Sequence, residues 1–537
     1  MRSLDVYVAG RKSALLTYDN GEYRFEYLPG TSESHAVSLG LPVTEDYSGV
    51  QYMMVPPPLQ VGFPEGVLLE TIYRLAGKAL KLDEDIDILA LVGRNMVGRV
   101  QMVPAGEPLS VAAGEGQSLP VIRDAGQLLD EPDTKKLLVD AIERFAAQTG
   151  LSGMFPKAAA ENMSAPHGGT LSFAYGDSIV KLETDEYLGV AVIEHACLSI
   201  CRSAGIPTVE SQLSENGEAL RVKRFDVLED GGRLGFEDFC GLLGNARTAK
   251  YSGDLKNIAQ VMDAYILDPE MKKSSFLQFF QTTVMNTVLR NGDAHLKNFG
   301  MLYEDTTKDP FLAPAYDIVC TTAWLPHDLP ALPMNGLRGW PDANALRNFG
   351  RDFCRLDDEA VTRVFEDTLA ALRSSDVLLD DLQAKYQAVV ELQHLREVVE
   401  RSKDMLLEDA LLHDVAITRV AAYQVEWAFH NGTLRQQDEG PHVSDMATQK
   451  RARSASQFAA PAKELQEQEN ARYKLLDKAS DLGYKIASGS LSRADAGPVY
   501  AEILEKGKQL GVTKETINER FSAGSARYSR TNGPKTV

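Results

Sequence analysis

The chain has 537 residues, of which 44% are hydrophobic and 25% are charged, and its net charge is -20. This length exceeds what a single hydrophobic core supports, so two to four domains or lobes of an ordinary globular protein are expected. The acidic balance argues against a protein whose whole body lies on nucleic acid.

The cysteines and the apolar segments indicate the compartment. Cys197 and Cys201 lie four residues apart on a predicted helix, which could suggest a metal site. No further ligands follow at suitable spacing, so two small core residues are favoured. Five scattered cysteines are typical of a reducing cytosol. Without a signal-peptide segment or a run approaching 18 apolar residues, we expect a cytoplasmic protein with no membrane contact.

The first hundred residues predict a small β-rich domain. Residues 4–8 and 12–18 alternate apolar and polar side chains, and Asp19-Asn20-Gly21 has the composition of a type I′ turn into residues 22–28. No residue here suggests chemistry. Residues 1–105 are therefore interpreted as a packing or docking domain.

A short loop at residues 151–157 has a weak phosphate-binding character. A Ser152-Gly153 turn followed by Lys157 can hold phosphates through backbone N–H groups and one cation. The loop is not a Walker A motif, and no G-x-G-x-x-G lies nearby. From these residues alone an ordinary loop is the better interpretation.

The next elements place a lysine beside a helix. Residues 170–175 and 178–182 predict a hairpin whose second strand contains Lys181, a position that usually faces solvent from an edge strand. The helix predicted at 190–204 carries Glu194 one turn in. Glu194 is the candidate partner of Lys181, and Glu186 is the second choice.

A strand at 220–225 then runs into Lys223-Arg224-Phe225-Asp226, and residues 236–290 have a helical pattern. Residues 276–289 are almost continuously apolar. This pattern predicts a buried helix that ends at the next polar loop.

That loop, residues 289–300, carries the main chemical signal. Asp293 and Asn298 have the D-x-x-x-x-N spacing of a kinase catalytic loop, in which the Asp accepts the proton of the attacking hydroxyl and the Asn holds magnesium. Asp317 follows between apolar neighbours, where a second metal-binding carboxylate would lie. Alone, each piece is better explained as a polar turn or as an Asp at a strand end, because short motifs often match by chance. In a kinase, Lys181 would reach the α- and β-phosphates, and residues 223–226 would be the hinge whose backbone binds adenine.

The C-terminal third is predicted to be helical and then modular. Residues 447–537 contain sixteen Lys or Arg against ten Asp or Glu, so the tail is basic. Residues 511–518 resemble the turn before a DNA-recognition helix, but a capped helix with a solvated charged face is favoured. The expected segments are helices at 358–374, 378–402 and 404–430, a linker at 431–456 and a basic helical extension at 457–537.

The order of these pieces resembles the HipA family of bacterial serine/threonine kinases, the toxin halves of toxin–antitoxin pairs. The resemblance covers roughly residues 1–430, and its most specific block runs from Asn291 to Asn298. It implies an α+β, two-lobed protein-kinase-like fold with a small β-rich N-terminal subdomain, an all-α C-lobe and an extra helical C-terminal tail. The kinase core would span 145–430, with the N-lobe at about 145–226 and the C-lobe at about 227–430.

The resemblance also implies the role of each site residue. Asp293 is the catalytic base, Asn298 and Asp317 bind Mg²⁺, and Glu194 pairs with Lys181. Ser152 is the implied autophosphorylation site; position 155 in the same loop is Phe where the family usually has Gln, and position 223 is Lys where Glu is common. The implied ATP-binding residues are Ser152, Gly153, Lys157, Lys181, Lys223, Arg224, Phe225, His295 and Tyr316.

The function implied is that of an ATP- and Mg²⁺-dependent protein kinase that arrests growth. Its substrate would be a translation component such as an aminoacyl-tRNA synthetase, its partner a HipB-like helix-turn-helix antitoxin, and DNA would be reached only through that antitoxin. Two alternatives stay open: a small-molecule kinase, and a non-catalytic co-repressor or scaffold. Intact residues at positions 181, 293, 298 and 317 argue against the scaffold, which needs none of them.

Overall fold

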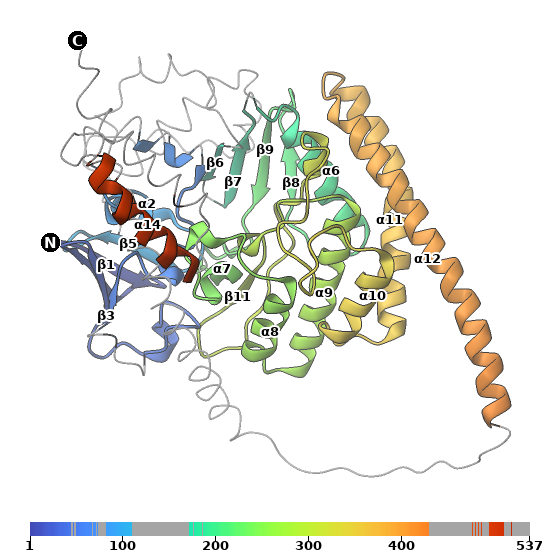
Figure 1. Cartoon of the computed structure of the whole chain (residues 1–537), viewed down its shortest axis with the longest axis horizontal. Coiled ribbons are helices and arrows are strands. Elements are labelled where there is room, and N and C mark those ends of the chain that lie inside the picture. The colour runs from blue at the N-terminus through green and yellow to red at the C-terminus, as the bar shows by residue number, and fades with distance from the viewer. Residues whose placement is uncertain are drawn as a thin grey trace.

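The computed structural model describes residues 1–109 and 171–428, apart from the short gaps 44–46, 48–49, 67, 71, 74–81, 176 and 185, and parts of 475–517. Figure 1 shows two bodies side by side: an N-terminal domain and a larger main body made of residues 171–428. Each has its own hydrophobic core. Among the described residues, every helix is too short or too polar to pass through a lipid bilayer.

The N-terminal domain is built on the predicted hairpin. Alternation along the first strand buries Leu4, Val6 and Val8, and Asp19 pairs with Glu22 across the predicted turn, whose Asn20 and Gly21 have φ of 51° and 88°. The hairpin prediction is confirmed. The helix α2 (Asp85–Val92) packs against β1 and β5. The sheet order is β4-β3-β2-β1-β5, with β1 at Arg2–Val8, β2 at Arg11–Asp19, β3 at Glu22–Tyr27, β4 at Gln51–Tyr52 and β5 at Val100–Pro104.

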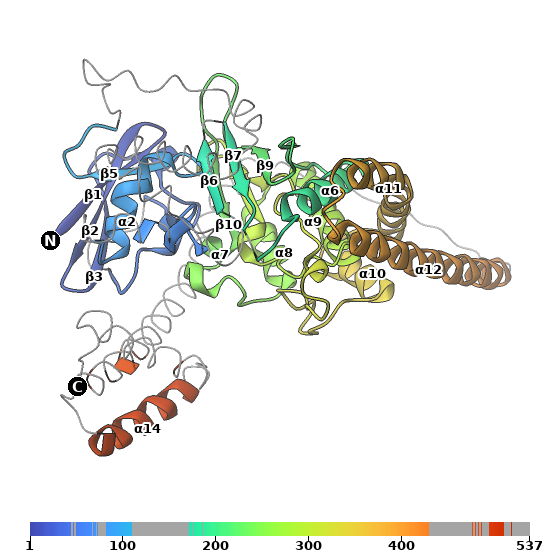
Figure 2. The ribbon, with the colours of Figure 1, turned by 90° about the horizontal axis from the view of Figure 1, so that it is seen from above.

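A four-stranded sheet lies between the N-terminal domain and the helices of the main body (Figure 2). Its order is β6-β7-β9-β8, so β7, which carries Lys181, is an inner strand and not an edge. Helix α6 (Val190–Ser203) packs on this sheet, and Cys197 and Cys201 lie on it as buried free thiols, as predicted. The strands are β6 at Leu171–Tyr175, β7 at Ser178–Leu182, β8 at Ser211–Leu213 and β9 at Ala219–Lys223.

The remainder of the main body is mostly helical. Helix α9 is the predicted buried helix, and its face of Phe279, Phe280 and Val284 lies fully inside the core. Helix α12 extends beyond the body at its C-terminal end (Figure 1). The helices are α7 (Phe239–Leu242), α8 (Leu255–Tyr265), α9 (Pro269–Val288), α10 (Ala343–Asp352), α11 (Asp358–Lys385) and α12 (Glu391–Ala428).

The prediction that this region is entirely α-helical is wrong. Three short strands form an antiparallel sheet in the order β10-β11-β12: Gly235–Asp238, Gly300–Tyr303 and Phe311–Leu312. All four residues of β11 are buried. A strand of two to four residues that is buried on both faces shows no alternation, so its sequence resembles a helix end or a loop.

The predicted breaks between helices at 374–378 and 402–404 are also wrong. Helix α11 continues to Lys385, the turn falls at residues 386–390, and α12 then runs unbroken from Glu391 to Ala428. Two serines, Ser374 and Ser375, lie at the position of the first predicted break. Their hydroxyls donate to the carbonyls of Ala371 and Leu372 within the helix, at 2.9 and 2.8 Å. Serine satisfied in this way is compatible with a helix interior.

The N-terminal domain docks on the main body through buried polar groups. The carboxylate of Glu237 on β10 accepts hydrogen bonds from the Ser38 hydroxyl at 2.5 Å and the Leu39 N–H at 2.7 Å. The Asp226 carboxylate accepts one from the Gly98 N–H at 2.7 Å. Such groups are costly to bury unless paired, so these bonds fix how the two bodies meet.

Beyond residue 428 the structure describes α14 (Arg493–Gln509) and a few residues around it. These residues share a small core of their own, separate from the cores of the N-terminal domain and main body. Its buried members are Leu475, Ala479, Leu482, Ile503 and Ile517.

Candidate active site

The loop after α9 is held in one conformation by its own polar side chains. Arg290 begins it with φ of 55°, a left-handed value that non-glycine residues rarely adopt. The Asn298 amide donates to the Asp293 carbonyl at 2.8 Å, which closes the loop between the two residues of the D-x-x-x-x-N spacing. Gly292 lies where a Cβ atom would be 2.0 Å from an Asp328 carboxylate oxygen, so any larger residue would have to displace the Asp328 side chain.

Asp293 is partly exposed at the tip of this loop. Its carboxylate accepts a hydrogen bond from the Tyr251 hydroxyl at 2.8 Å and lies 4.0 Å from the His295 ring. Burial raises the pKa of Asp293, and His295 and the Tyr251 hydroxyl oppose this rise. Burial lowers the pKa of His295, so the imidazole is neutral near pH 7.

Lys181 joins the four-stranded sheet to α6 and to the segment after β12. Its ammonium group lies 2.7 Å from the Glu194 carboxylate and forms an ion pair with Asp317. The structure thus brings Lys181 together with Glu194, whereas Glu186 is exposed. Asp317 has φ of 58°, a second strained non-glycine conformation next to the site.

The charges of this cluster are strongly coupled. Burial alone would lower the pKa of Lys181, but Asp317 and Glu194 outweigh it and raise that pKa, so the lysine stays charged. Burial would raise the pKa of Asp317, and the nearby ammonium instead holds it low. Burial raises the pKa of Glu194 to about 7 against the pull of Lys181.

These groups face one cavity of about 470 Å³ between the N-terminal domain and the main body. Phe225 and Tyr316 form one apolar part of its wall, with ring centroids 5.4 Å apart. Lys223 lines the cavity, and its ammonium lies 3.8 Å from Glu210. The Arg224 guanidinium instead pairs with Asp226 at 2.6 Å and donates to the Met96 carbonyl of the N-terminal domain. Any contact of Arg224 with a nucleotide would therefore use its backbone.

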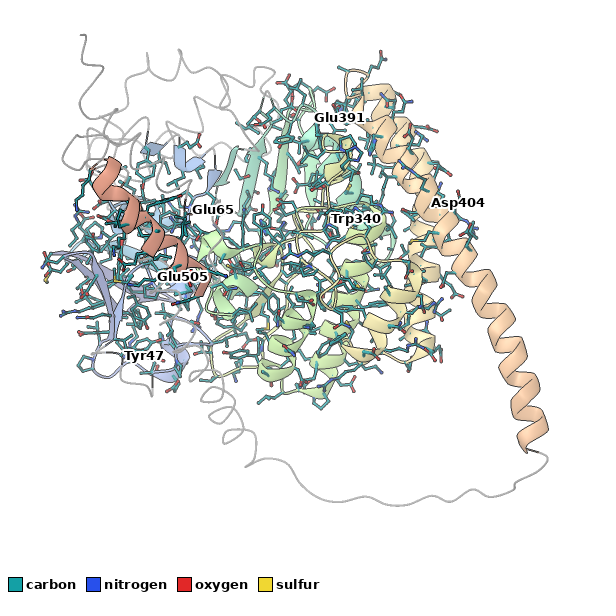
Figure 3. The ribbon with its side chains drawn as sticks, viewed as in Figure 1. Tyr47, Glu65, Trp340, Glu391, Asp404 and Glu505 are labelled. Atoms are coloured by element: carbon teal, nitrogen blue, oxygen red, sulfur yellow. The ribbon has the colours of Figure 1, made fainter. Side chains whose placement is uncertain are left out.

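The N-terminal domain supplies part of the cavity wall, and nothing in its sequence predicted this. Glu65 lies where the domain meets the main body (Figure 3) and is 2.7 Å from the Lys297 ammonium and 3.2 Å from that of Lys250. Burial would lower the pKa of Lys297, but Asp238 and Glu65 raise it. Glu65, Lys250 and Tyr251 are site residues that sequence reasoning missed, because each belongs to a short loop without a recognisable motif.

The predicted phosphate loop lies outside the described residues. Ser152, Gly153 and Lys157, including the implied autophosphorylation site, therefore keep the status of sequence predictions.

Asn298 and Asp317 offer the kind of atoms that magnesium prefers. Asn298 uses its amide nitrogen within the loop, so its carboxamide oxygen is the atom that can face a cation. The Asp317 side chain is 41% exposed, and both residues line the cavity. Carboxylate and amide oxygens are typical Mg²⁺ ligands, so this pair fits the metal.

Comparisons with known proteins concern the same regions. The family model for the HipA N-terminal domain matches residues 4–103, and that for the HipA-like C-terminal domain matches residues 149–375. Two curated proteins of Sinorhizobium fredii (strain NBRC 101917 / NGR234) are similar. "Putative kinase Y4dM" is 29% identical over 291 residues, 51% of this chain and 64% of the relative. "Putative kinase Y4mE" is 26% identical over 358 residues, 60% of this chain and 81% of the relative. The chain thus spans less than two thirds of the first relative.

A solved structure shares the fold. HipA of Shewanella oneidensis MR-1, determined in complex with HipB and its operator DNA, is 17% identical and superposes with a TM-score of 0.51. The similarity covers 75% of this chain and 98% of that one. The arrangement of an N-terminal β-rich domain beside a mixed α/β main body is therefore shared beyond this chain.

Proposed function

Because this chain belongs to the HipA family, we propose that it is an ATP- and Mg²⁺-dependent serine/threonine protein kinase and the toxin of a HipA-type toxin–antitoxin pair. The observation that carries the proposal is the convergence of Lys181, Asp317 and the Asp293 loop on one cavity. Phosphoryl transfer needs a cation for the phosphates, a metal-binding carboxylate and a base within reach of one another.

In the proposed reaction, the hydroxyl oxygen of a serine attacks the γ-phosphorus while Asp293 accepts the hydroxyl proton. The bond from the γ-phosphorus to the bridging oxygen breaks, and ADP leaves with its electron pair. Lys181, held by Glu194, stabilises the α- and β-phosphates. Mg²⁺ on Asn298 and Asp317 would neutralise charge on the phosphates.

The rest of the cavity supports ATP binding. Phe225 and Tyr316 provide apolar surface for adenine, and the backbone of Lys223 and Arg224 provides its hydrogen-bond partners. The buried neutral His295 can donate a hydrogen bond near the γ-phosphate. In this proposal Ser152, Gly153 and Lys157 complete the phosphate contacts.

The proposed partners follow from the family. The Shewanella relative was solved with HipB and operator DNA, and we propose that this chain likewise binds a HipB-like helix-turn-helix antitoxin and reaches DNA through it. Its proposed substrate is a protein of translation, such as an aminoacyl-tRNA synthetase, modified in the cytoplasm.

Phosphoproteomics after brief induction tests the function. The comparison is wild type against Asp293→Ala, with the surface variant Asp305→Ala as a matched carboxylate control. New phosphoserine or phosphothreonine in a translation protein, present in wild type and Asp305→Ala only, is the expected result. Transfer of radiolabelled phosphate from ATP only to metabolites in a lysate, and not to proteins, would indicate a small-molecule kinase. If the protein bound promoter DNA together with the antitoxin but transferred no phosphate, it would be a co-repressor.

We also propose that the protein inhibits itself by autophosphorylation of Ser152. A phosphate there adds about −1.5 to −2 charge, which competes with the ATP phosphates for the backbone N–H groups and for Lys157. Ser152→Asp should fold normally and lose ATP binding, whereas a serine that only caps a turn tolerates Asp. Calorimetric titration with Mg·ATP checks this. Unchanged ATP affinity in Ser152→Asp would be incompatible with it.

A further inference from the structure

Residues 247–251 of the main body contact the N-terminal domain at one end and the catalytic loop at the other. At the N-terminal end, the Arg247 guanidinium pairs with both carboxylate oxygens of Asp85, at 2.6 and 3.1 Å. It also lies over the Phe63 ring, 4.1 Å from its centroid. The Arg247 N–H donates to the Gln60 side chain at 2.8 Å. One arginine thus fixes the start of this segment on three residues of the other domain.

Lys250, in the middle of the segment, contacts both the N-terminal domain and the catalytic loop. The Lys250 ammonium lies 3.2 Å from Glu65 of the N-terminal domain. The Lys250 carbonyl accepts a hydrogen bond from the Leu296 N–H at 3.0 Å, inside the catalytic loop. Lys250 is therefore joined to the N-terminal domain by its side chain and to the catalytic loop by its backbone.

The end of the segment reaches the proposed base. The Tyr251 hydroxyl donates to the Asp293 Oδ1 atom at 2.8 Å, and the Tyr251 ring lies edge-on to His295 with centroids 5.2 Å apart. Tyr251 is 51% exposed, so burial gives little reason for its placement. A carboxylate accepts hydrogen bonds on both oxygens. The bond from Tyr251 to Oδ1 therefore fixes the rotation of the Asp293 side chain and leaves Oδ2 to accept the proton of the substrate hydroxyl.

We infer that residues 247–251 couple the N-terminal domain to the catalytic base, and that Tyr251 is a positioning residue for Asp293. This inference rests on the proposed kinase function. The chain of contacts runs from Asp85 through Arg247 and Lys250 to Tyr251 and Asp293. We call this chain of contacts the relay. Because the orientation of a base contributes strongly to the rate of phosphoryl transfer, loosening the relay should lower kcat without removing any group that contacts ATP.

The first test removes only the hydroxyl. Tyr251→Phe should lower kcat about 10-fold, the order expected for a lost hydrogen bond to a charged group, with the Kd for Mg·ATP unchanged in calorimetry. Tyr251→His, which keeps a ring donor, should recover part of the rate, and Tyr251→Leu should not. An unchanged kcat in Tyr251→Phe would overturn the positioning role.

The second test asks whether the N-terminal domain acts through this segment. Arg247→Ala should lower kcat, and the double variant Arg247→Ala/Tyr251→Phe should be no slower than Tyr251→Phe, because both break one relay. Arg233→Ala is the matched control. It removes another arginine that reaches the N-terminal domain, at the Met96 carbonyl, with no contact to the segment. The fold-change in kcat caused by Arg233→Ala should multiply with the fold-change caused by Tyr251→Phe. Asp85→Asn weakens the same contact from the other side if Arg247→Ala folds poorly.

Hydrogen exchange separates this inference from the kinase proposal. In Arg247→Ala, the Leu296 amide, which is bonded to the Lys250 carbonyl, should exchange faster than in wild type, and in Arg233→Ala it should not. Unchanged exchange in Arg247→Ala, or additive effects in the double variant, would overturn the relay. Faster exchange in a protein without any phosphoryl transfer would overturn the kinase proposal alone.

Discussion

At the scale of single residues, the site combines strained backbone with paired charge. Asp317 and Arg290 both have left-handed φ values, 58° and 55°, which persist only where the surrounding contacts impose them. Here those contacts include the Lys181 ion pair with Asp317 and the Asn291 amide, which donates to the Asp317 carbonyl at 3.4 Å. The strain therefore lies where the proposed base and metal ligand must be held at a fixed separation.

The two carboxylates should respond differently to removal. Asp293→Ala should lower kcat by about 10²–10⁴-fold, the usual contribution of a positioned base, with Mg·ATP binding retained. Asp317→Ala should also weaken Mg·ATP binding, because it removes a proposed metal ligand and a partner of Lys181. Steady-state kinetics with calorimetry measures both. Full activity of Asp293→Ala would contradict the assigned role.

His195 should make stability depend on pH. Burial and the charge of Arg202 lower its pKa from 6.5 to about 4. The unfolded chain then binds more protons between these values, so stability is present above pH 6.5 and is lost as pH falls toward 4. The loss should reach about 2–3 kcal/mol. Denaturant unfolding of His195→Gln should show a smaller loss over this range. His327→Gln, an exposed control, should behave like wild type.

Sequence patterns identified the site residues that belong to regular elements or to a motif. The periodicity located the strand of Lys181 and the helix of Glu194, and the resemblance to a kinase suggested that the two side chains pair. The structure has them 2.7 Å apart. Tyr251 and Glu65 belong to loops, where spacing predicts nothing about direction. Their contacts with Asp293 and Lys297 join residues far apart in the chain, which a local pattern cannot reveal.

At the scale of elements, long periodic segments were predictable and short buried ones were not. The N-terminal hairpin and α9 have clear patterns over many residues. The sheet of β10, β11 and β12 has strands of two to four residues, too short to show a period. It matters for the candidate site nevertheless, because β11 follows the loop that contains Asp293 and β10 carries the Glu237 docking carboxylate.

The C-terminal tail should behave as a separate element. Its described residues share a small core of their own, so a chain ending near residue 440 should stay soluble and bind ATP with unchanged affinity. If the basic tail contacts DNA, its removal should also abolish a salt-dependent, sequence-independent part of the affinity. Sedimentation and DNA titration over a range of salt measure both. Aggregation of the shortened protein would show that the tail packs on the main body.

At the scale of the whole molecule, a few buried groups fix one domain on the other. The Glu237 carboxylate accepts hydrogen bonds from Ser38, Leu39 and the Tyr303 hydroxyl, the last at 2.8 Å. Because these donors cannot reach water, the carboxylate holds both domains and the small sheet in one arrangement. The cavity wall contributed by Glu65 depends on that arrangement.

Removing this carboxylate should destabilise the whole protein. Glu237→Ala leaves buried donors unpaired, and the free energy of unfolding should fall by about 3 kcal/mol or more. Glu304→Ala, an exposed carboxylate on a neighbouring loop, should change it by less than about 0.5 kcal/mol. Denaturant unfolding measures both variants. Equal stability of the two would contradict the docking role of Glu237.

The ion pair between Lys181 and Asp317 has a consequence for synthesis on the ribosome. The two residues are 136 positions apart, so the lysine is made long before its second carboxylate partner exists. Helices α11 and α12, which cover the core, are translated later still. A nascent chain should therefore have an incomplete cleft until α12 has been made, and the proposed phosphoryl transfer should not begin before then.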